Sequence, residues 1–184
     1  MSDFCDLGTV RLETKRLILR RFTPEDAEAV FTGWTGDEEC ALRCAWRVHP
    51  SPEYTREILT HWIEEYEDNA YNWLVELKDT HEVIGNISTV AIKRKHRNCE
   101  VGYCYGSRFW GKGYATEALC CILRFLLDEC HFHVVEARHS SSNPASGRVM
   151  QKAGMRRDAV LPQRQYDADT DTYTDLIVYS SIRE

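Results

Sequence analysis

The chain has 184 residues, of which 43% are hydrophobic and 28% charged, and its formal net charge is −6. This length and composition are typical of one globular domain with its own core. The acidic excess argues against nonspecific nucleic-acid binding, which needs a basic surface, and no apolar run approaches the ~20 residues of a membrane-spanning helix.

The first residues, MSDFCDLGTVRLETKR, lack the basic and then apolar pattern of a secretion signal, so we expect a cytoplasmic protein. Thiols stay reduced in that compartment, and the eight cysteines are therefore expected to be free. Cys40 and Cys44 are four residues apart, and Cys130 stands near His131 and His133, but neither group has the paired spacing of zinc ligands. We expect no metal site.

Apolar periodicity and capping residues predict the elements. Thr23-Pro24 and Ser51-Pro52 each place a capping residue before a proline, which is typical of a helix start. In chain order we expect strand 14–22, helix 24–34, an irregular or weakly helical connection 37–50, helix 52–69, strands 71–78, 83–92 and 99–105, helix 113–129, strand 133–138, helix 144–152, and strands 156–160 and 173–182.

The order of these elements predicts an α/β architecture with one mixed sheet. Consecutive strands in the middle of the chain favour antiparallel pairing, while the helix between strands 99–105 and 133–138 favours one parallel pair. We expect a mostly antiparallel sheet of seven strands with about four helices on its faces, in a single domain over residues 1–184.

A glycine-rich turn between a strand and a helix is the strongest local signal. Glycine permits close approach of the backbone, and a helix start offers free N–H groups to an anion. Gly106, Gly111 and Lys112 match G-x-x-x-x-G-K, but Gly113 stands where a phosphate-binding P-loop has Ser or Thr. Gly111 and Gly113 also match part of the dinucleotide motif G-x-G-x-x-G, with Thr116 in place of its last glycine.

The same turn fits R-x-x-G-x-G at every defined position, from Arg108 to Gly113. This motif resembles the pyrophosphate loop of the GNAT acyltransferases. The segments TKRLILRRFTPEDAEAVF, ALRCAWRVHPSPEY, RFWGKGYATEA and SSNPASGRVMQKAGM are similar, in the same order, to the branch of that family that acetylates ribosomal-protein N-termini (RimJ/RimL-like). The resemblance covers nearly the whole chain and implies the GNAT fold.

The resemblance also implies an enzyme. We expect an N-acetyltransferase that passes the acetyl group of acetyl-CoA directly to a primary amine, with a protein or peptide N-terminus as the favoured acceptor. A small-molecule amine acetyltransferase and a non-catalytic CoA-binding module are the alternatives. No nucleic-acid or membrane partner is expected, and the protein is expected to be a monomer or homodimer.

Carried over onto this chain, the resemblance implies a cofactor site on three segments. Backbone N–H groups of the loop would hold the pyrophosphate, and the strand before it would pair with the pantetheine amides. Asn143 would contact the pantetheine arm and Ser146 the thioester sulfur. The residues expected at the cofactor are Gly102, Tyr103, Cys104, Arg108, Trp110, Gly111, Lys112, Gly113, Tyr114, Ala115, Asn143 and Ser146.

The predicted catalytic residues are Glu100 and Ser146. An amine attacks only in its neutral form, so a base has to remove a proton, and Glu100 begins the strand expected to hold the cofactor. Glu82 and Glu76 are weaker options for the base. Many members of the family have a tyrosine as general acid seven residues after the asparagine, but this chain has Met150 there, so Ser146 is expected to assist the leaving thiolate.

Overall fold

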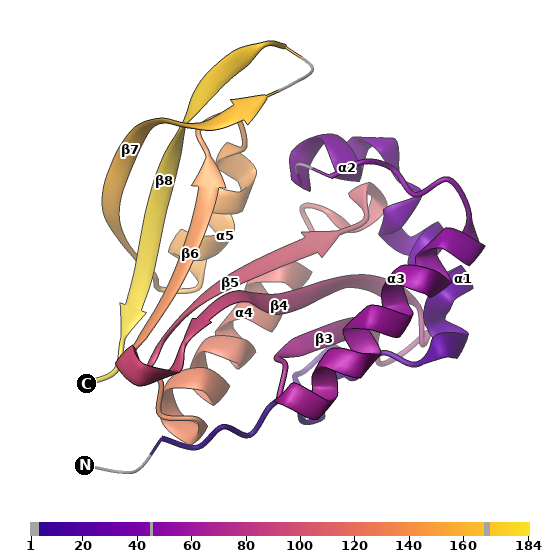
Figure 1. Cartoon of the computed structure of the whole chain (residues 1–184), viewed down its shortest axis with the longest axis horizontal. Coiled ribbons are helices and arrows are strands. Elements are labelled where there is room, and N and C mark those ends of the chain that lie inside the picture. The colour runs from indigo at the N-terminus through magenta and orange to yellow at the C-terminus, as the bar shows by residue number, and fades with distance from the viewer. Residues whose placement is uncertain (1–3, 45, 168–169) are drawn as a thin grey trace.

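The computed structural model describes residues 4–44, 46–167 and 170–184. In this part of the chain, eight strands form one sheet in the order β1-β2-β3-β4-β5-β6-β8-β7 (Figure 1). The strands are Leu12–Glu13 (β1), Leu17–Arg20 (β2), Asn72–Leu77 (β3), Val83–Lys93 (β4), Asn98–Tyr105 (β5), Val134–Ser140 (β6), Arg156–Asp167 (β7) and Thr172–Ile182 (β8).

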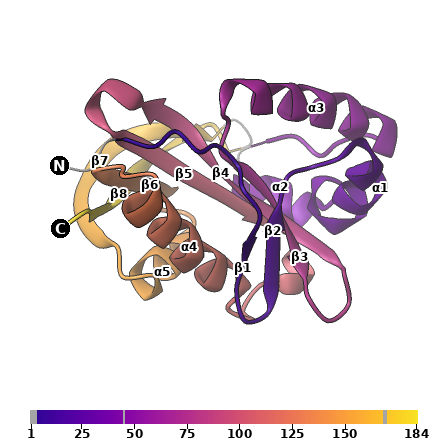
Figure 2. The same cartoon turned by 90° about the horizontal axis from the view of Figure 1, so that it is seen from below.

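Helices cover both faces of this sheet. Figure 2 shows α1 and α3 on one face and α4 on the other. None of the described helices is long and apolar enough to cross a membrane. The α-helices are Ala27–Val30 (α1), Glu38–Cys44 (α2), Pro52–Glu64 (α3), Tyr114–Arg124 (α4) and Pro144–Lys152 (α5); α1 continues in a π-helical turn, Phe31–Thr35, as does α4 in Phe125–Glu129.

The predicted mixed sheet is confirmed, with two corrections. The expected strand 14–22 is shorter, at Leu17–Arg20 (β2), and an unpredicted short strand, β1, precedes it and pairs with it antiparallel, which makes eight strands rather than seven. The chain turns between them because Thr14 exchanges hydrogen bonds with Leu17. The connection 37–50 contains a regular helix, α2, whose start is stabilised by Asp37, an acceptor for the N–H groups of Glu39 and Cys40.

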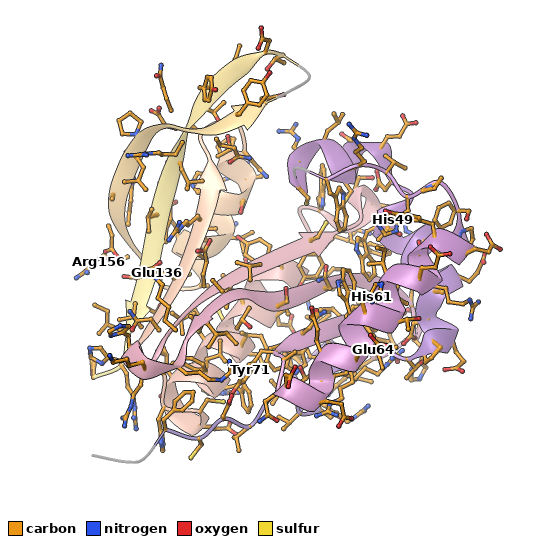
Figure 3. All side chains as sticks on the ribbon, in the orientation of Figure 1. His49, His61, Glu64, Tyr71, Glu136 and Arg156 are labelled. Carbon is orange, nitrogen blue, oxygen red and sulfur yellow. The ribbon has the colours of Figure 1, made fainter. Side chains whose placement is uncertain are left out.

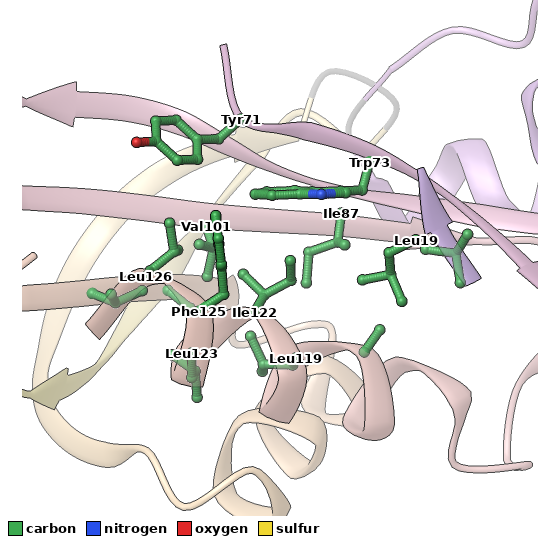
Figure 4. Packing of buried hydrophobic residues seen from close by; sticks show 14 of the residues in the cluster. Leu19, Tyr71, Trp73, Ile87, Val101, Leu119, Ile122, Leu123, Phe125 and Leu126 are labelled. Carbon is green, nitrogen blue, oxygen red and sulfur yellow. The ribbon is translucent and has the colours of Figure 1, made fainter. Parts of the chain in front are cut away.

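The larger core lies between the sheet and α4. Leu119, Ile122 and Phe125 bury their side chains against the strands, and Trp73 meets the Phe125 ring edge-on at a centroid distance of 5.8 Å (Figure 4). Each such side chain contributes about 1.5–3 kcal/mol by leaving water. A second core, around Trp34 and Leu59, lies between the opposite face of the sheet and the helices α1 and α3. Strand β5 therefore packs against a core on each of its two faces.

The sheet ends at β1 on one edge and β7 on the other. β7 is twelve residues long, and its pairing with β8 shifts register between Leu161 and Gln165. Pro162 and Gln163 lie inside this irregularity, and Gln163 has a left-handed backbone with φ of 52°.

Candidate active site

The predicted parallel pair is β5 and β6, and it opens halfway along. Pairing runs from Asn98↔Val134 to Val101↔Ala137. β5 continues to Tyr105 and β6 to Ser140, but the two strands diverge from this point (Figure 1). Residues 102–104, expected at the cofactor, stand on the diverging part of β5. This divergence exposes the edge of β5 to a ligand in place of a neighbouring strand.

Gly102 stands opposite an irregularity in the next strand. The pairing of β4 with β5 shifts register between Thr89 and Ala91, on either side of Val90. A Cβ atom at Gly102 would lie 3.0 Å from the Val90 side chain, a tight contact that this exposed side chain would have to relieve by a small shift.

The glycine-rich loop joins the end of β5 to α4. Gly111 and Gly113 have φ of 74° and 83°, which glycine adopts without strain. Gly113 is the N-cap of α4 and has no side chain to occupy the first N–H groups of the helix. Positive charge from the helix dipole accumulates at the same end. The local backbone of 110–115 therefore suits the phosphate contacts predicted for it.

Arg16 lies against this loop, a contact that was not predicted from the sequence. Its guanidinium donates to the Lys112 carbonyl oxygen at 3.0 Å, pairs with Glu117 at 2.7 Å and lies over the Tyr114 ring at 4.4 Å. The turn between β1 and β2 thus supplies a cation beside the start of α4.

The charged residues predicted in the loop have protein partners. Arg108 pairs with Glu82 at 3.0 Å and stacks over the Phe109 ring. Lys112 places its ammonium 5.6 Å from the centre of the same ring. The Trp110 indole donates to the Tyr105 carbonyl oxygen at 2.6 Å. Phe109 is buried in the core, so the loop is anchored from below while its backbone stays at the surface.

Asn143 and Ser146 stand at the start of α5, beside the diverging strands. Asn143 is the N-cap: its Oδ1 accepts the Ser146 N–H at 3.3 Å, and its Nδ2 donates to the Arg43 carbonyl oxygen of α2 at 3.3 Å. The Ser146 hydroxyl lies 3.0 Å from the hydroxyl of Tyr103. The structure thus brings together the Tyr103 and Ser146 predicted on separate segments.

The contact between Tyr103 and Ser146 places a tyrosine hydroxyl near Ser146, in a chain that has Met150 where many relatives have a tyrosine as general acid. Burial raises the pKa of Tyr103, so its hydroxyl keeps its proton at neutral pH. Met150, at the place of the usual tyrosine, is buried in the core. The sequence suggested Tyr103 only as a backbone contact, because its distance to Ser146 depends on how β5 and α5 pack.

Glu100 stands where β5 still pairs with β6. Its neighbours Cys99 and Val101 belong to the core on the α4 face, so strand alternation turns Glu100 to the opposite face. Glu136 is directly across on β6 (labelled in Figure 3), and Arg138 bonds both carboxylates, at 3.3 Å and 3.1 Å. Burial raises the pKa of Glu100, Arg138 lowers it in part, and the charge of Glu136 raises it further.

The two weaker options for the base have other partners. Glu76 is buried between Arg20, at 2.8 Å, and His81, at 2.6 Å. Glu82, just before β4, pairs with Arg108, just after β5, and so lies at the end of these strands that is far from Glu100. All three carboxylates have ion-pair partners, but the hydrogen bonds of Arg20 and His81 lower the pKa of Glu76 despite its burial, whereas burial raises the pKa of Glu100.

Asp37 couples α2 to the loop. One of its carboxylate oxygens accepts from the start of α2, and the other accepts the Ser107 N–H at 2.7 Å. Cys104, on the intervening strand, turns its thiol to α2 and lies 2.9 Å from the sulfur of Cys40. These contacts join segments that are more than sixty residues apart in the chain.

Comparisons with known proteins agree with this geometry. The model of the acetyltransferase (GNAT) domain matches residues 16–156. An uncharacterized N-acetyltransferase of Bacillus subtilis, YoaA, is 32% identical over 172 residues, covering 94% of this chain and 96% of the relative. The ribosomal protein uS5-alanine N-acetyltransferase of Escherichia coli is 26% identical and covers 81% of this chain and 79% of its own length.

A solved structure of RimL, a ribosomal L7/L12 alpha-N-protein acetyltransferase in complex with coenzyme A, has a TM-score of 0.82 at 18% identity, over 95% of this chain and 98% of that one. The family match sets aside the P-loop and dinucleotide interpretations of the glycine-rich turn. The loop, the diverging parallel strands and the match to the domain model over most of the chain show that this protein belongs to the GNAT acetyltransferases and uses acetyl-CoA as its cosubstrate.

Proposed function

We propose that the acceptor is the α-amino group of a protein or peptide N-terminus; the Escherichia coli relative is named as a ribosomal protein uS5-alanine N-acetyltransferase. The observation that carries the proposal is the match to this relative over 81% of the chain. It fits the expectation from the sequence that the chain acetylates N-termini of the ribosomal-protein type.

The face of the sheet opposite α4 is polar near Glu100, which suits a cationic amine. Glu100 and Glu136 place two carboxylates side by side there, and Arg138 pairs with both, so the three side chains together carry one negative charge. Further along the same face, Asn86 and Ser88 of β4 pair with Cys104 and Gly102. They line a hollow of about 250 Å³ next to α3. We propose that an extended N-terminal segment lies along this surface.

Deprotonation of the acceptor is assigned to Glu100. An α-amino group has a pKa of about 7.7–8.0, compared with about 10.4 for lysine, so an N-terminus loses its proton far more easily. A carboxylate with a raised pKa accepts that proton more readily than an ordinary glutamate. The neutral nitrogen then attacks the acetyl carbonyl carbon, forming the C–N bond while the C–S bond breaks.

The hydroxyls of Tyr103 and Ser146 are assigned to the leaving group. The sulfur of CoA departs as a thiolate, and a hydroxyl hydrogen bond stabilises that charge. Backbone N–H groups of the diverging part of β5 are assigned to the carbonyl oxygen. The residues proposed for the cofactor remain those predicted from the sequence, with Arg16 added beside the loop.

A panel of acceptors tests the proposal. Purified protein and acetyl-CoA are incubated with peptides that begin with Ala or Ser, the same peptides blocked at the N-terminus but carrying one lysine, and small polyamines. Release of free CoA and the mass of the product report transfer. We expect turnover with free N-termini and at least tenfold lower kcat/KM with the blocked peptides. Preference for polyamines or lysine would overturn the proposed acceptor.

A further inference from the structure

Three cysteine thiols converge between α2 and β5. Cys40 and Cys44 are one helical turn apart, so both project from the same side of α2. Cys104 meets them from β5, with its sulfur 2.9 Å from that of Cys40 and 3.0 Å from that of Cys44. All three sulfurs lie within 4.8 Å of one another, and no other group of three such ligands occurs in the described residues.

The surroundings of the cluster are mostly apolar. Cys40 and Cys104 are buried in the core with Trp34, while Cys44 is half-buried. The Tyr105 carbonyl oxygen lies 3.4 Å from the sulfur of Cys40. The cluster is therefore shielded on the side of the core, and Cys44 is its most exposed member.

This arrangement has the ligands and nearly the spacing of a metal site. A zinc ion lies about 2.3 Å from each thiolate sulfur in a tetrahedral site, which places the sulfurs about 3.8 Å apart. The sulfurs in this structure would move apart by less than about 1 Å to reach that spacing. Three thiolates and no carboxylate ligand select a soft or borderline ion such as zinc over magnesium or calcium.

We propose that Cys40, Cys44 and Cys104 bind one Zn²⁺ ion, with water or the Tyr105 carbonyl oxygen as the fourth ligand. The ion would join α2 to the strand that is expected to hold the cofactor. Because Arg43 of α2 contacts Asn143 at the start of α5, this link would also fix the contact between α2 and α5. The proposal does not depend on which amine is acetylated.

Binding is measured on reduced, metal-free protein titrated with Zn²⁺ by calorimetry and native mass spectrometry. We expect one ion per chain and a rise in Tm. Alkylation followed by peptide mapping should show that Zn²⁺ protects Cys44, the most exposed of the three thiols, and leaves Cys120, exposed on α4, fully reactive. Absence of stoichiometric binding, or unchanged alkylation of Cys44, would overturn the proposal.

Matched variants identify the ligands. Cys44→Ser changes the least buried member, and we expect it to abolish stoichiometric binding while retaining affinity for acetyl-CoA, which reports a folded protein. Cys120→Ser should bind zinc as the unchanged protein does. Equal zinc binding by both variants contradicts the assignment. So does a disulfide from Cys104 to Cys40 or Cys44, instead of bound zinc, in protein purified with reductant and without a chelator.

Discussion

Glu100 owes its proposed role to its neighbours. Its pKa is raised first by burial and then by Glu136, while Arg138 partly offsets both. A base acts only when it is deprotonated, so activity should fall as the pH drops through this raised pKa. The acid limb of the kcat/KM profile should therefore lie at higher pH than for an ordinary glutamate, whose pKa is about 4.3.

Glu100→Gln should reduce turnover by about 10²–10⁴-fold, because general base catalysis is removed. Affinity for acetyl-CoA, measured by calorimetry, should be nearly unchanged, since Glu100 faces away from α4. The matched variant Glu136→Gln removes a like charge beside Glu100 and should move the acid limb to lower pH. Unchanged turnover of Glu100→Gln across pH 6–9 would show that another group is the base.

Arg20 stabilises the fold by pairing with two buried carboxylates. It bonds Asp26 and Glu76, both at 2.8 Å, and both carboxylates are almost fully buried. Burial alone would raise the pKa of each carboxyl, but the hydrogen bonds and charge of Arg20 outweigh it, and both pKa values are lowered. This stability is present above the ordinary pKa of about 4 and is lost as the pH falls through the lowered values.

Arg20→Met should decrease the free energy of unfolding at pH 7 by about 3–5 kcal/mol, because two buried carboxylates lose their partner. Urea unfolding at pH 7 and pH 3 measures the effect. The difference between variant and unchanged protein should shrink at pH 3, where the carboxyls become protonated. Arg11→Met, which removes an exposed ion pair with Glu13, is the control and should leave the free energy of unfolding nearly unchanged. Equal losses at both pH values would contradict this account.

The glycine-rich loop acts as one element through its backbone. A Cβ atom at Gly111 would meet no protein atom within 4 Å. A substitution there therefore disturbs the local φ of 74° and the space proposed for the pyrophosphate, and leaves the core untouched.

Gly111→Asp should lower acetyl-CoA affinity at least a hundredfold, because it adds strain, bulk and negative charge beside the phosphates. Gly111→Ala adds only the backbone strain of the left-handed conformation, about 1–2 kcal/mol. It should therefore lower acetyl-CoA affinity less than Gly111→Asp does. Calorimetric titration with acetyl-CoA compares the two, and circular dichroism checks the fold. If both variants bind as tightly as the unchanged protein, this loop does not hold the cosubstrate.

At the scale of the whole molecule, local patterns predicted most of the fold. Apolar periodicity located β3, β4, β5 and α4, and the helix between β5 and β6 predicted their parallel pairing, which the structure confirms. The strand β1 was missed because it has only two residues, Leu12–Glu13, which are too few to show a strand's alternation. The segment that contains α2 was expected to be irregular or weakly helical, and the contact of Asp37 with the distant Ser107, which depends on the packing of α2 on the loop, is not visible in the sequence.

In the candidate site too, local features were predicted from the sequence and contacts between distant segments were not. Glycine spacing located the loop, because its conformation depends on adjacent residues. Arg16 beside Lys112, Glu136 beside Glu100, and Cys104 beside Cys40 depend on strand register and helix packing, which bring together residues more than thirty positions apart. A single sequence contains no local signal for such pairs.

The irregular course of β7 affects how this protein behaves at high concentration. A straight outer strand offers a row of free N–H and C=O groups on which another chain can extend the sheet. In β7, Pro162 has no N–H to offer and Gln163 bends the strand, while Arg156 and Arg157 add charge at one end. Replacing Pro162 with Val should therefore increase light scattering in concentrated solution with little change in acetyl-CoA affinity. Unchanged scattering would mean that the bend and the charges protect this edge of the sheet without the proline.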